Sequence, residues 1–149
     1  MAKIRVTKEF KFEAAHALLG YDGLCKNIHG HSYKLFVTVI GEPIVDKSDT
    51  KLGMVYDFGD LKFIVNSQIV KKFDHSIILN KDADTAKFDL LDEMFTRNHF
   101  TPYQPTCENM VLDFVEKIKK YLPEGIELFS VKLYETANSS AEWVVTDNE

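Results

Sequence analysis

The sequence has few of the residues that cross-link a chain, and no segment suited to a membrane or a secretion signal. It contains 2 cysteines, 4 prolines and 7 glycines among 149 residues. Cys25 and Cys107 lie in unrelated contexts, so we expect free thiols in a reducing cytoplasm rather than a disulfide framework. No apolar run approaches the ~20 residues of a membrane-spanning helix. The N-terminal residues lack the apolar core and cleavage site of a secretory signal.

Basic residues are too few to favour a nucleic-acid partner. Lys and Arg number 18 against 23 Asp and Glu, the formal net charge is −5, and no basic block occurs. Nucleic-acid-binding domains usually carry a basic face. A phosphorylated small molecule is still compatible, because a few local cations suffice to bind it. We therefore expect a small-molecule partner, and neither a nucleic acid nor a membrane.

The composition that is present is that of one globular domain. Hydrophobic residues make up 45% of the chain and charged residues 28%, which is typical of globular proteins. A chain of this length buries roughly 68–70% of its unfolded surface. No repeat, low-complexity tract or Pro/Gly/Ser linker divides the sequence, so we expect a single domain over residues 1–149.

Strand-like patterns stand near both ends of the chain. Residues 4–12 alternate between apolar and polar types, and residues 31–41 are rich in β-branched and aromatic types. Both patterns predict strands, which would pair antiparallel. Residues 13–28 are expected to form a long loop between them. Two further strands are predicted near residues 127–135 and 141–146.

Two helices are predicted between these pairs of strands. Asp57 is expected to cap the first helix and Thr106 the second. Their apolar positions recur at helical spacing, namely Leu61, Ile64, Val65, Ile69 and Phe73 in the first helix and Met110, Val111, Phe114, Val115 and Ile118 in the second. Pro123 and Gly125 would end the second helix. The order of two strands, two helices and two strands indicates an α+β fold with an antiparallel sheet.

The connection between the two helices, residues 81–104, has the least regular pattern. We interpret it as a surface insertion in which Phe88, Leu91 and Phe95 could form a short helix. Connections of this length are usually functional or disordered. His99 within it has no expected partner and is interpreted as a loop residue.

Three histidines form the strongest candidate site. His29 and His31 flank Gly30 at the start of a predicted strand, and residues i and i+2 of a strand point to the same side. His16 follows the preceding strand and would join them if the two strands pair antiparallel. Three neutral imidazoles that leave one position open are typical of catalytic zinc. Copper and iron are less favoured, because no thiolate-rich or carboxylate-rich shell is present. The alternative is a histidine pair on a solvated strand face.

Other titratable residues leave alternatives open. Cys25, four positions before His29, could be a fourth zinc ligand that closes the site, or a base whose pKa is lowered by a nearby cation. The carboxylate of Asp74 could orient the His75 imidazole for proton transfer, or His75 could bind a helix-end carbonyl. Glu135 could accept two N–H bonds from a heterocycle, or be an exposed residue at a strand end.

Five short motifs together resemble one known family. They are FEAAH at 12–16, CKNIHGH at 25–31, DHSIILN at 74–80, PTCE at 105–108 and YET at 134–136. In this order they resemble the 6-pyruvoyl-tetrahydropterin synthase superfamily, over residues 4–146. The three residues between the cysteine and HGH resemble the bacterial 6-carboxy-tetrahydropterin synthases of queuosine biosynthesis, whereas the animal-type pyruvoyl enzymes usually have five.

The resemblance implies a fold and a set of residue roles. The fold would be a T-fold, a four-stranded antiparallel sheet with two helices packed on one face. Its subunits would assemble as trimers or hexamers with sites at subunit boundaries. The implied roles are zinc binding by His16, His29 and His31, general base catalysis by Cys25, proton relay by Asp74 and His75, and pterin binding by Glu135 with Thr106 and Glu108 nearby.

The resemblance also implies a reaction. The substrate would be 7,8-dihydroneopterin triphosphate, and the products 6-carboxy-5,6,7,8-tetrahydropterin, acetaldehyde and triphosphate. The alternatives are a 6-pyruvoyl-tetrahydropterin synthase and a non-catalytic zinc or pterin-binding module in which Cys25 completes the coordination shell. This sequence departs from the family in its long 81–104 connection and in Cys107, which stands where small hydroxyl residues are frequent. Both departures concern substrate entry rather than the zinc site.

Overall fold

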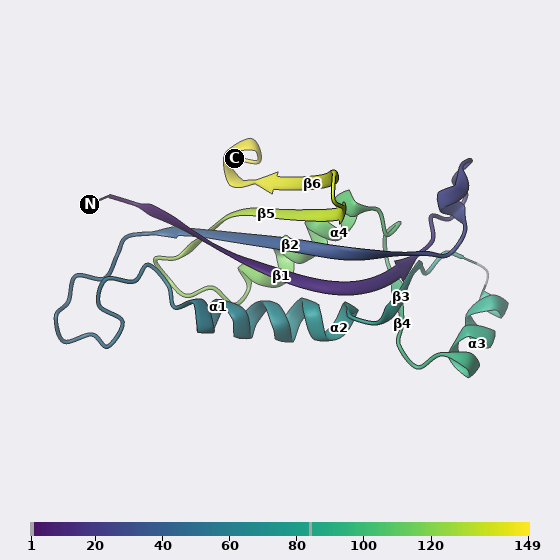
Figure 1. Ribbon diagram of the computed structural model, residues 1–149, viewed down its shortest axis with the longest axis horizontal. Helices are drawn as coiled ribbons and strands as arrows, with labels where there is room; N and C mark the ends of the chain where they lie inside the picture. The colour runs from purple at the N-terminus through teal and green to yellow at the C-terminus, as the bar shows by residue number, and fades with distance from the viewer. Residues whose placement is uncertain (1, 84) are drawn as a thin grey trace.

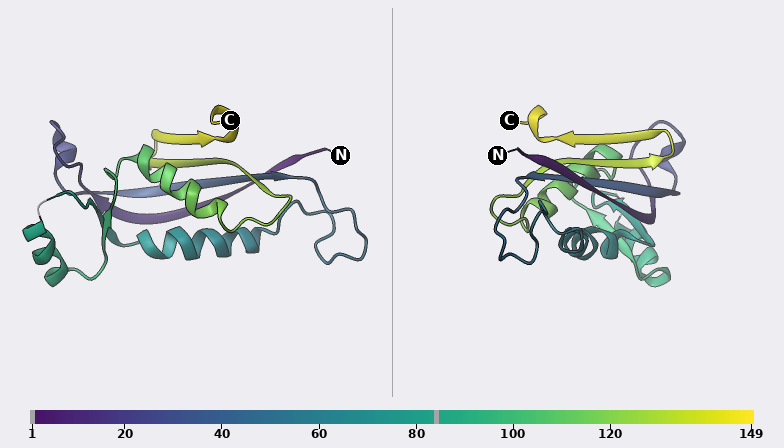
Figure 2. Two further views of the ribbon diagram at one scale, coloured as in Figure 1. Left: turned by 180° about the vertical axis from the view of Figure 1, so that it is seen from behind. Right: turned by 60° about the vertical axis from the view of Figure 1, so that its left-hand side comes forward.

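One six-stranded sheet runs through the protein, with its longer helices on one face (Figure 1, Figure 2). The computed structural model describes residues 2–83 and 85–149, without the side chains of residues 85–88. The strands lie in the order β4-β3-β1-β2-β5-β6. Their bounds are β1 Ile4–His16, β2 His29–Gly41, β3 Ser76–Asn80, β4 Asn98–Thr101, β5 Glu127–Thr136 and β6 Ser139–Val144. No helix within the described ranges has the length and apolar character to cross a membrane.

Two helical segments cover the sheet. The first is continuous, with α1 (Phe58–Val65), a π-helical turn (Asn66–Val70) and α2 (Lys71–Phe73) in succession. The second is α4 (Cys107–Lys119). A separate helix, α3 (Thr85–Met94), lies beyond the edge of the sheet (Figure 1). Two helices on one face of a largely antiparallel sheet agree with the predicted α+β class.

The long β1–β2 pair provides the scaffold of the molecule. Its two strands pair antiparallel from Ile4↔Gly41 to His16↔His29. Their alternating apolar residues face the helices and are buried, as expected for a strand with one solvated face. The Phe12 and Tyr33 rings, directly opposite each other, stack with centroids 4.9 Å apart. This packing fixes the strand register up to the end that carries the histidines.

Both predicted helix caps are present. The Asp57 carboxylate accepts a hydrogen bond from Gly59 N at 2.6 Å, and the Thr106 hydroxyl accepts one from Asn109 N at 3.2 Å. Each satisfies a backbone N–H that the first helical turn leaves without a partner. The apolar positions predicted for both helices are buried against the sheet, so helical spacing identified the core face correctly.

The sheet differs from the predicted four-stranded antiparallel one. β3 pairs parallel with β1 at residues 14–16, and β4 pairs parallel with β3. β1 also continues through His16, so the loop predicted from residue 13 is wrong over its first four residues. Ala14 and Ala15 interrupt the alternation that identified the strand, although Ala14 is buried in it.

Residues 81–104 are only in part a surface insertion. Leu90 and Met94 of α3 are exposed, which agrees with that interpretation and with the predicted short helix. The side chain of Phe88, one of the residues used to predict this helix, lies outside the described part of the chain. β4 contradicts the interpretation, because it joins the sheet. Its four residues are too few to give a recognisable alternation.

Candidate metal centre

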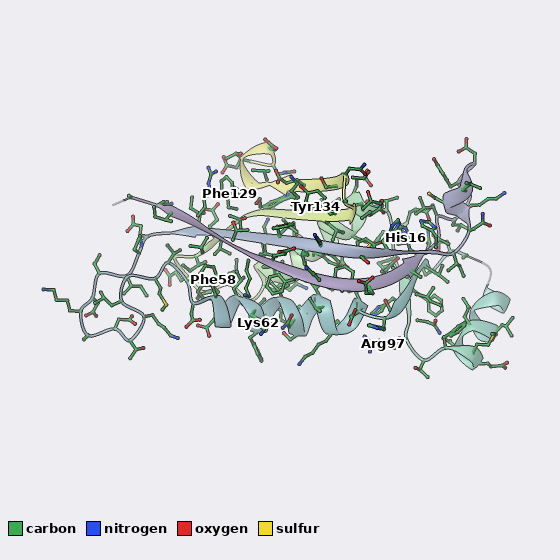
Figure 3. All side chains as sticks on the ribbon, viewed as in Figure 1. His16, Phe58, Lys62, Arg97, Phe129 and Tyr134 are labelled. Carbon is green, nitrogen blue, oxygen red and sulfur yellow. The ribbon has the colours of Figure 1, made fainter. Side chains whose placement is uncertain are left out.

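Three imidazoles meet where β1 ends and β2 begins. His16 pairs directly with His29 across the two strands, and His31 pairs with Ala14. The Nε2 atom of His16 lies 3.0 Å from Nε2 of His29 and 3.2 Å from Nε2 of His31. Figure 3 labels His16 at this end of the sheet. Among the described residues, these three histidines form the one group of histidine, cysteine and carboxylate side chains close enough to share an ion.

Hydrogen bonds on the other ring nitrogens orient two of the imidazoles. Nδ1 of His16 lies 2.7 Å from the Pro105 carbonyl oxygen, and Nδ1 of His29 lies 2.8 Å from that of Asn27. A carbonyl oxygen only accepts, so each Nδ1 carries the proton and donates. The lone pairs on Nε2 therefore face one common point. Backbone partners of this kind are typical of metal-binding histidines.

The geometry and donor set fit a zinc ion. Tetrahedral coordination at ~2.0–2.1 Å places neighbouring nitrogens about 3.3 Å apart, close to the separations of 3.0 and 3.2 Å from His16. Unprotonated nitrogens this close repel each other unless a proton or a cation lies between them. Three imidazoles leave one tetrahedral position for a water or substrate oxygen.

Burial keeps the central imidazole neutral. His16 is 1% exposed, and its pKa falls to about 4, chiefly because burial penalises the charged form, with the nearby His29 and His31 adding to the effect. Its hydrogen bond to the Pro105 carbonyl acts in the opposite direction. Burial also lowers the pKa of His31. Neutral imidazoles are the form that binds a metal.

Glu135 lies beside the histidine cluster without being part of it. Its Oε1 atom is 3.7 Å from His16 Nε2, and its side chain is 25% exposed. Its negative charge contributes to the raised pKa of the buried Tyr33 hydroxyl, for which burial is the main cause. A carboxylate at this position could accept hydrogen bonds from a ligand bound near the metal position.

Cys25 lies apart from the three imidazoles. It is exposed in a short 3-10 turn, Leu24–Lys26. Its sulfur is not in the group of possible ligand atoms formed by the three histidines. The structure therefore does not place this thiol in the fourth coordination position.

Asp74 and His75 form a hydrogen-bonded pair at the end of α2. Oδ2 of Asp74 lies 3.0 Å from Nδ1 of His75, and its Oδ1 accepts from Glu13 N at 2.9 Å. The bond from Glu13 is the main cause of a lowered pKa for Asp74. The His75 side chain is 75% exposed. His75 lines a cavity of about 370 Å³ together with Ala15, His31 and Ser32, whereas Asp74, His16 and His29 do not line it.

The residues around Pro105 have mainly structural contacts. Thr106 caps α4, and Glu108 is exposed in the first helical turn. The buried Cys107 thiol donates to the Leu133 carbonyl at 3.2 Å, and burial raises its pKa to about 12. It is the Pro105 carbonyl that contacts His16 directly.

The site also depends on backbone groups that sequence reasoning missed. The carbonyls of Asn27 and Pro105 orient imidazoles, and the backbone of Glu13 binds both Asp74 and His75. Contacts made by main-chain atoms do not depend on the residue type, so the sequence does not reveal them. Only the place of Pro105 within the PTCE motif could have pointed to its carbonyl.

Comparison with known proteins identifies the family. The family model described as 6-pyruvoyl tetrahydropterin synthase matches residues 5–144. The 6-carboxy-5,6,7,8-tetrahydropterin synthase of Haemophilus influenzae is 35% identical over 141 residues, covering 93% of this chain and 97% of that protein. The human 6-pyruvoyl tetrahydrobiopterin synthase is 32% identical, covering 91% and 87%. The chain therefore belongs to the 6-pyruvoyl tetrahydropterin synthase family.

Solved structures of similar fold agree with this assignment. The 6-pyruvoyl tetrahydropterin synthase of Caenorhabditis elegans superposes with a TM-score of 0.67 at 28% identity, covering 97% of this chain and 96% of that one. An uncharacterised protein from Wolinella succinogenes reaches a TM-score of 0.80 at 19% identity, covering 97% and 99%. The latter shows likeness of fold alone. The predicted T-fold is thus confirmed.

Proposed function

We propose that this protein is a zinc-dependent lyase that converts 7,8-dihydroneopterin triphosphate and one water molecule into 6-carboxy-5,6,7,8-tetrahydropterin, acetaldehyde and triphosphate. The observation that carries the proposal is the convergence of three imidazole Nε2 atoms on one point, with Cys25 outside the set. The bacterial relatives named 6-carboxy-5,6,7,8-tetrahydropterin synthase support this choice of reaction. The spacing of three residues between Cys25 and HGH supports it further.

His16, His29 and His31 would hold the zinc ion. Bound zinc supplies a Lewis acid that stabilises negative charge developing on a substrate oxygen. The side chain of Glu135 would accept hydrogen bonds from the amine and ring N–H groups of the pterin. Its partial exposure and its place beside His16 suit an acceptor that contacts the substrate rather than the metal. Thr106 and Glu108 would lie near the same ring.

Proton transfer is assigned to Cys25, Asp74 and His75. The Cys25 thiolate would take a carbon-bound proton from the substrate, and His75 would return one at another atom. The lowered pKa of Asp74, caused mainly by its bond from Glu13 N, keeps that carboxylate ionised. It can then accept from His75 Nδ1–H and stabilise the charged imidazolium. Triphosphate loss and side-chain cleavage follow from these transfers.

We further propose a homo-oligomer, a trimer or hexamer, with sites at the subunit boundaries. β3 pairs only with residues 14–16 of β1, and Glu13 bonds to Asp74 and His75, so within the described chain residues 4–12 offer an open strand edge. β6 offers another at the opposite side of the sheet. An open edge of this length presents unpaired N–H and C=O groups that can bind a strand of another chain. The high exposure of Cys25 and His75 suits a site completed by a neighbouring subunit.

The proposed setting is queuosine biosynthesis in the cytoplasm. The two cysteines are unpaired, as expected in a reducing compartment.

Product analysis tests the reaction directly. Purified protein would be incubated with 7,8-dihydroneopterin triphosphate, and the products measured by mass. We expect release of acetaldehyde and triphosphate with a pterin that carries a carboxyl group. A retained three-carbon diketo side chain would instead identify a 6-pyruvoyl-tetrahydropterin synthase. Pterin binding without conversion would favour the non-catalytic module.

Metal analysis tests the zinc site. His29→Ala removes one of three ligands, so we expect loss of most bound zinc and of all turnover. His99→Ala is the matched control, because His99 lies outside the cluster and its removal should leave zinc bound. Full zinc occupancy in the His29→Ala variant would refute the assignment.

Cys25→Ala separates the enzyme from the zinc-binding module. If Cys25 is the base, the variant keeps its zinc and loses turnover. If its sulfur completes the coordination shell, the variant loses metal as well. Because Cys25 is exposed, its replacement by alanine should leave the protein folded. Neither result would then be explained by unfolding.

A further inference from the structure

Arg97 contacts the C-terminal end of the first helical segment. Its Nε–H donates to the Asp74 carbonyl oxygen at 2.9 Å. Its Nη2 donates to the Lys71 carbonyl and, at 3.4 Å, to that of Lys72. The side chain comes from the connection just before β4, and Figure 3 labels it below this helix end. One guanidinium thus binds three carbonyls of the last helical turn.

Carbonyls at a helix end have no intrahelical partner, so a side chain that donates to them holds the end in place. His99 assists, because its Nε2 lies 2.5 Å from the Lys72 carbonyl while its ring stacks on Phe73 at 4.6 Å. Arginine suits this position because its fork of N–H donors reaches several acceptors at once, which a lysine ammonium does less well.

The residue that follows this helix end has an unusual backbone. His75 has φ of +59°, a left-handed conformation that is uncommon for a residue other than glycine. On one side it is held by β1, since His75 N donates to the Glu13 carbonyl at 2.6 Å. On the other side, the carbonyl of the preceding residue, Asp74, is the one that Arg97 binds. A conformation of this kind persists only where the surroundings impose it.

We propose that Arg97 is a positioning residue, whose hold on the Lys71 and Asp74 carbonyls keeps His75 in the left-handed conformation that directs it to the cavity shared with His31. The inference rests on the proton-transfer role proposed above for Asp74 and His75. It also gives residues 81–104 a function, because this connection delivers Arg97 to the helix end. Arg97 need not contact substrate or metal.

Three variants test the proposal. Arg97→Gln removes the charge and most of the donors, and Arg97→Lys keeps the charge but not the fork. Lys72→Ala is the matched control, because it removes an exposed cation from the same helix end and leaves the carbonyl acceptor in place. All three would be compared with the wild-type protein loaded with zinc, by steady-state kinetics and by amide hydrogen exchange of residues 72–77.

We expect Arg97→Gln to lower kcat by about tenfold to a hundredfold, the effect of a displaced catalytic group, with KM and zinc content nearly unchanged. Exchange should rise at residues 74–76 and stay unchanged in α4. Arg97→Lys should recover part of kcat, and Lys72→Ala should behave as wild type. If Arg97→Gln does not fold, Arg97→Lys gives the same readouts with a smaller change.

Unchanged exchange at residues 74–76 in both Arg97 variants would overturn the proposal. An equal fall in kcat in Arg97→Gln and Lys72→Ala would also overturn it. The loss of activity would then come from removing a positive charge at the helix end rather than from losing the bonds to the carbonyls. Failure of the proposed function gives a different pattern, in which wild-type protein does not turn over the pterin while exchange in Arg97→Gln still rises locally.

Discussion

At the residue scale, the candidate site depends on which atom of each ring faces inward. Two imidazoles on alternate positions of β2 share a side because of strand geometry. The carbonyls of Pro105 and Asn27 then accept from Nδ1–H of His16 and His29, respectively. This leaves Nε2 of both rings unprotonated and able to bind a cation. Sequence distance hides such contacts, since Pro105 lies far along the chain from His16.

The two cysteines should differ in reactivity. Cys25 is exposed, whereas Cys107 is buried with its pKa raised to about 12, and the thiolate is the reactive form. We expect iodoacetamide to add one adduct to the native protein and two after denaturation, measured by intact mass. Cys25→Ser should remove the native adduct. Native labelling that persists in this variant would contradict the buried position of Cys107.

Substitution of Glu135 should affect the ligand more than the metal. Glu135→Gln keeps the shape but loses the charge beside His16, so it should weaken binding of a pterin by about tenfold or more, the value of a charge-assisted hydrogen bond. Zinc content should stay at the wild-type level. The measurement is pterin titration by fluorescence with parallel metal analysis, and Glu142→Gln, on the neighbouring strand, is the control. Unchanged pterin affinity would refute the role.

At the element scale, the site is held where regular structure ends. The histidines lie where β1 ends and β2 begins, while Asp74 and His75 follow the last turn of a helix that contains a π-helical turn. Such π-helical turns are rare and often lie near functional sites. The segment just before α4 contributes too, because the carbonyl of Pro105, which precedes the Thr106 cap, contacts His16.

The cap of α4 offers a measurement of stability. Thr106→Ala removes the acceptor for Asn109 N and should lower the free energy of unfolding by about 1 kcal/mol. Thr106→Ser keeps the hydroxyl and should recover most of that loss. Urea unfolding of both variants measures the difference. Equal stability of Thr106→Ala and wild type would show that the cap contributes little.

At the scale of the whole molecule, the sheet has strand edges without a partner strand at two places in the described chain. The N-terminal part of β1 and the whole of β6 leave strand edges open within the described chain. Beside the β1 edge lies a groove of about 420 Å³. Its lining includes Ile4, Met54 and Phe58, whose side chains are partly exposed. Apolar surface next to an open edge favours covering by another copy of the chain.

The mass in solution tests this assembly. We expect light scattering after size exclusion to give three or six times the 17.1 kDa of one chain. Ile4→Asp places a charge in the groove beside the β1 edge and should shift the mass toward that of one chain. Leu112→Asp, at an exposed position of α4, is the control. A wild-type protein of single-chain mass would refute the proposed oligomer.

Local pattern determined much of this fold. Alternation identified most of β1, and helical spacing with Asp57 and Thr106 identified both long helices and their caps. These features depend on neighbours within a few residues, so a sequence displays them directly. The family resemblance went further and named candidate site residues, but it carried no information about their hydrogen bonds.

Only the tertiary structure decided how distant segments meet. The parallel strands β3 and β4 and the carbonyls around His16 depend on backbone pairing between segments far apart in sequence. The hydrogen bond from Arg97 to the Asp74 carbonyl at the helix end likewise joins segments that are distant in sequence. Main-chain groups are chemically alike at almost every position, so no residue type announces where they will pair. Residue type determined which side chains could bind a metal, and packing of the whole chain determined where they point.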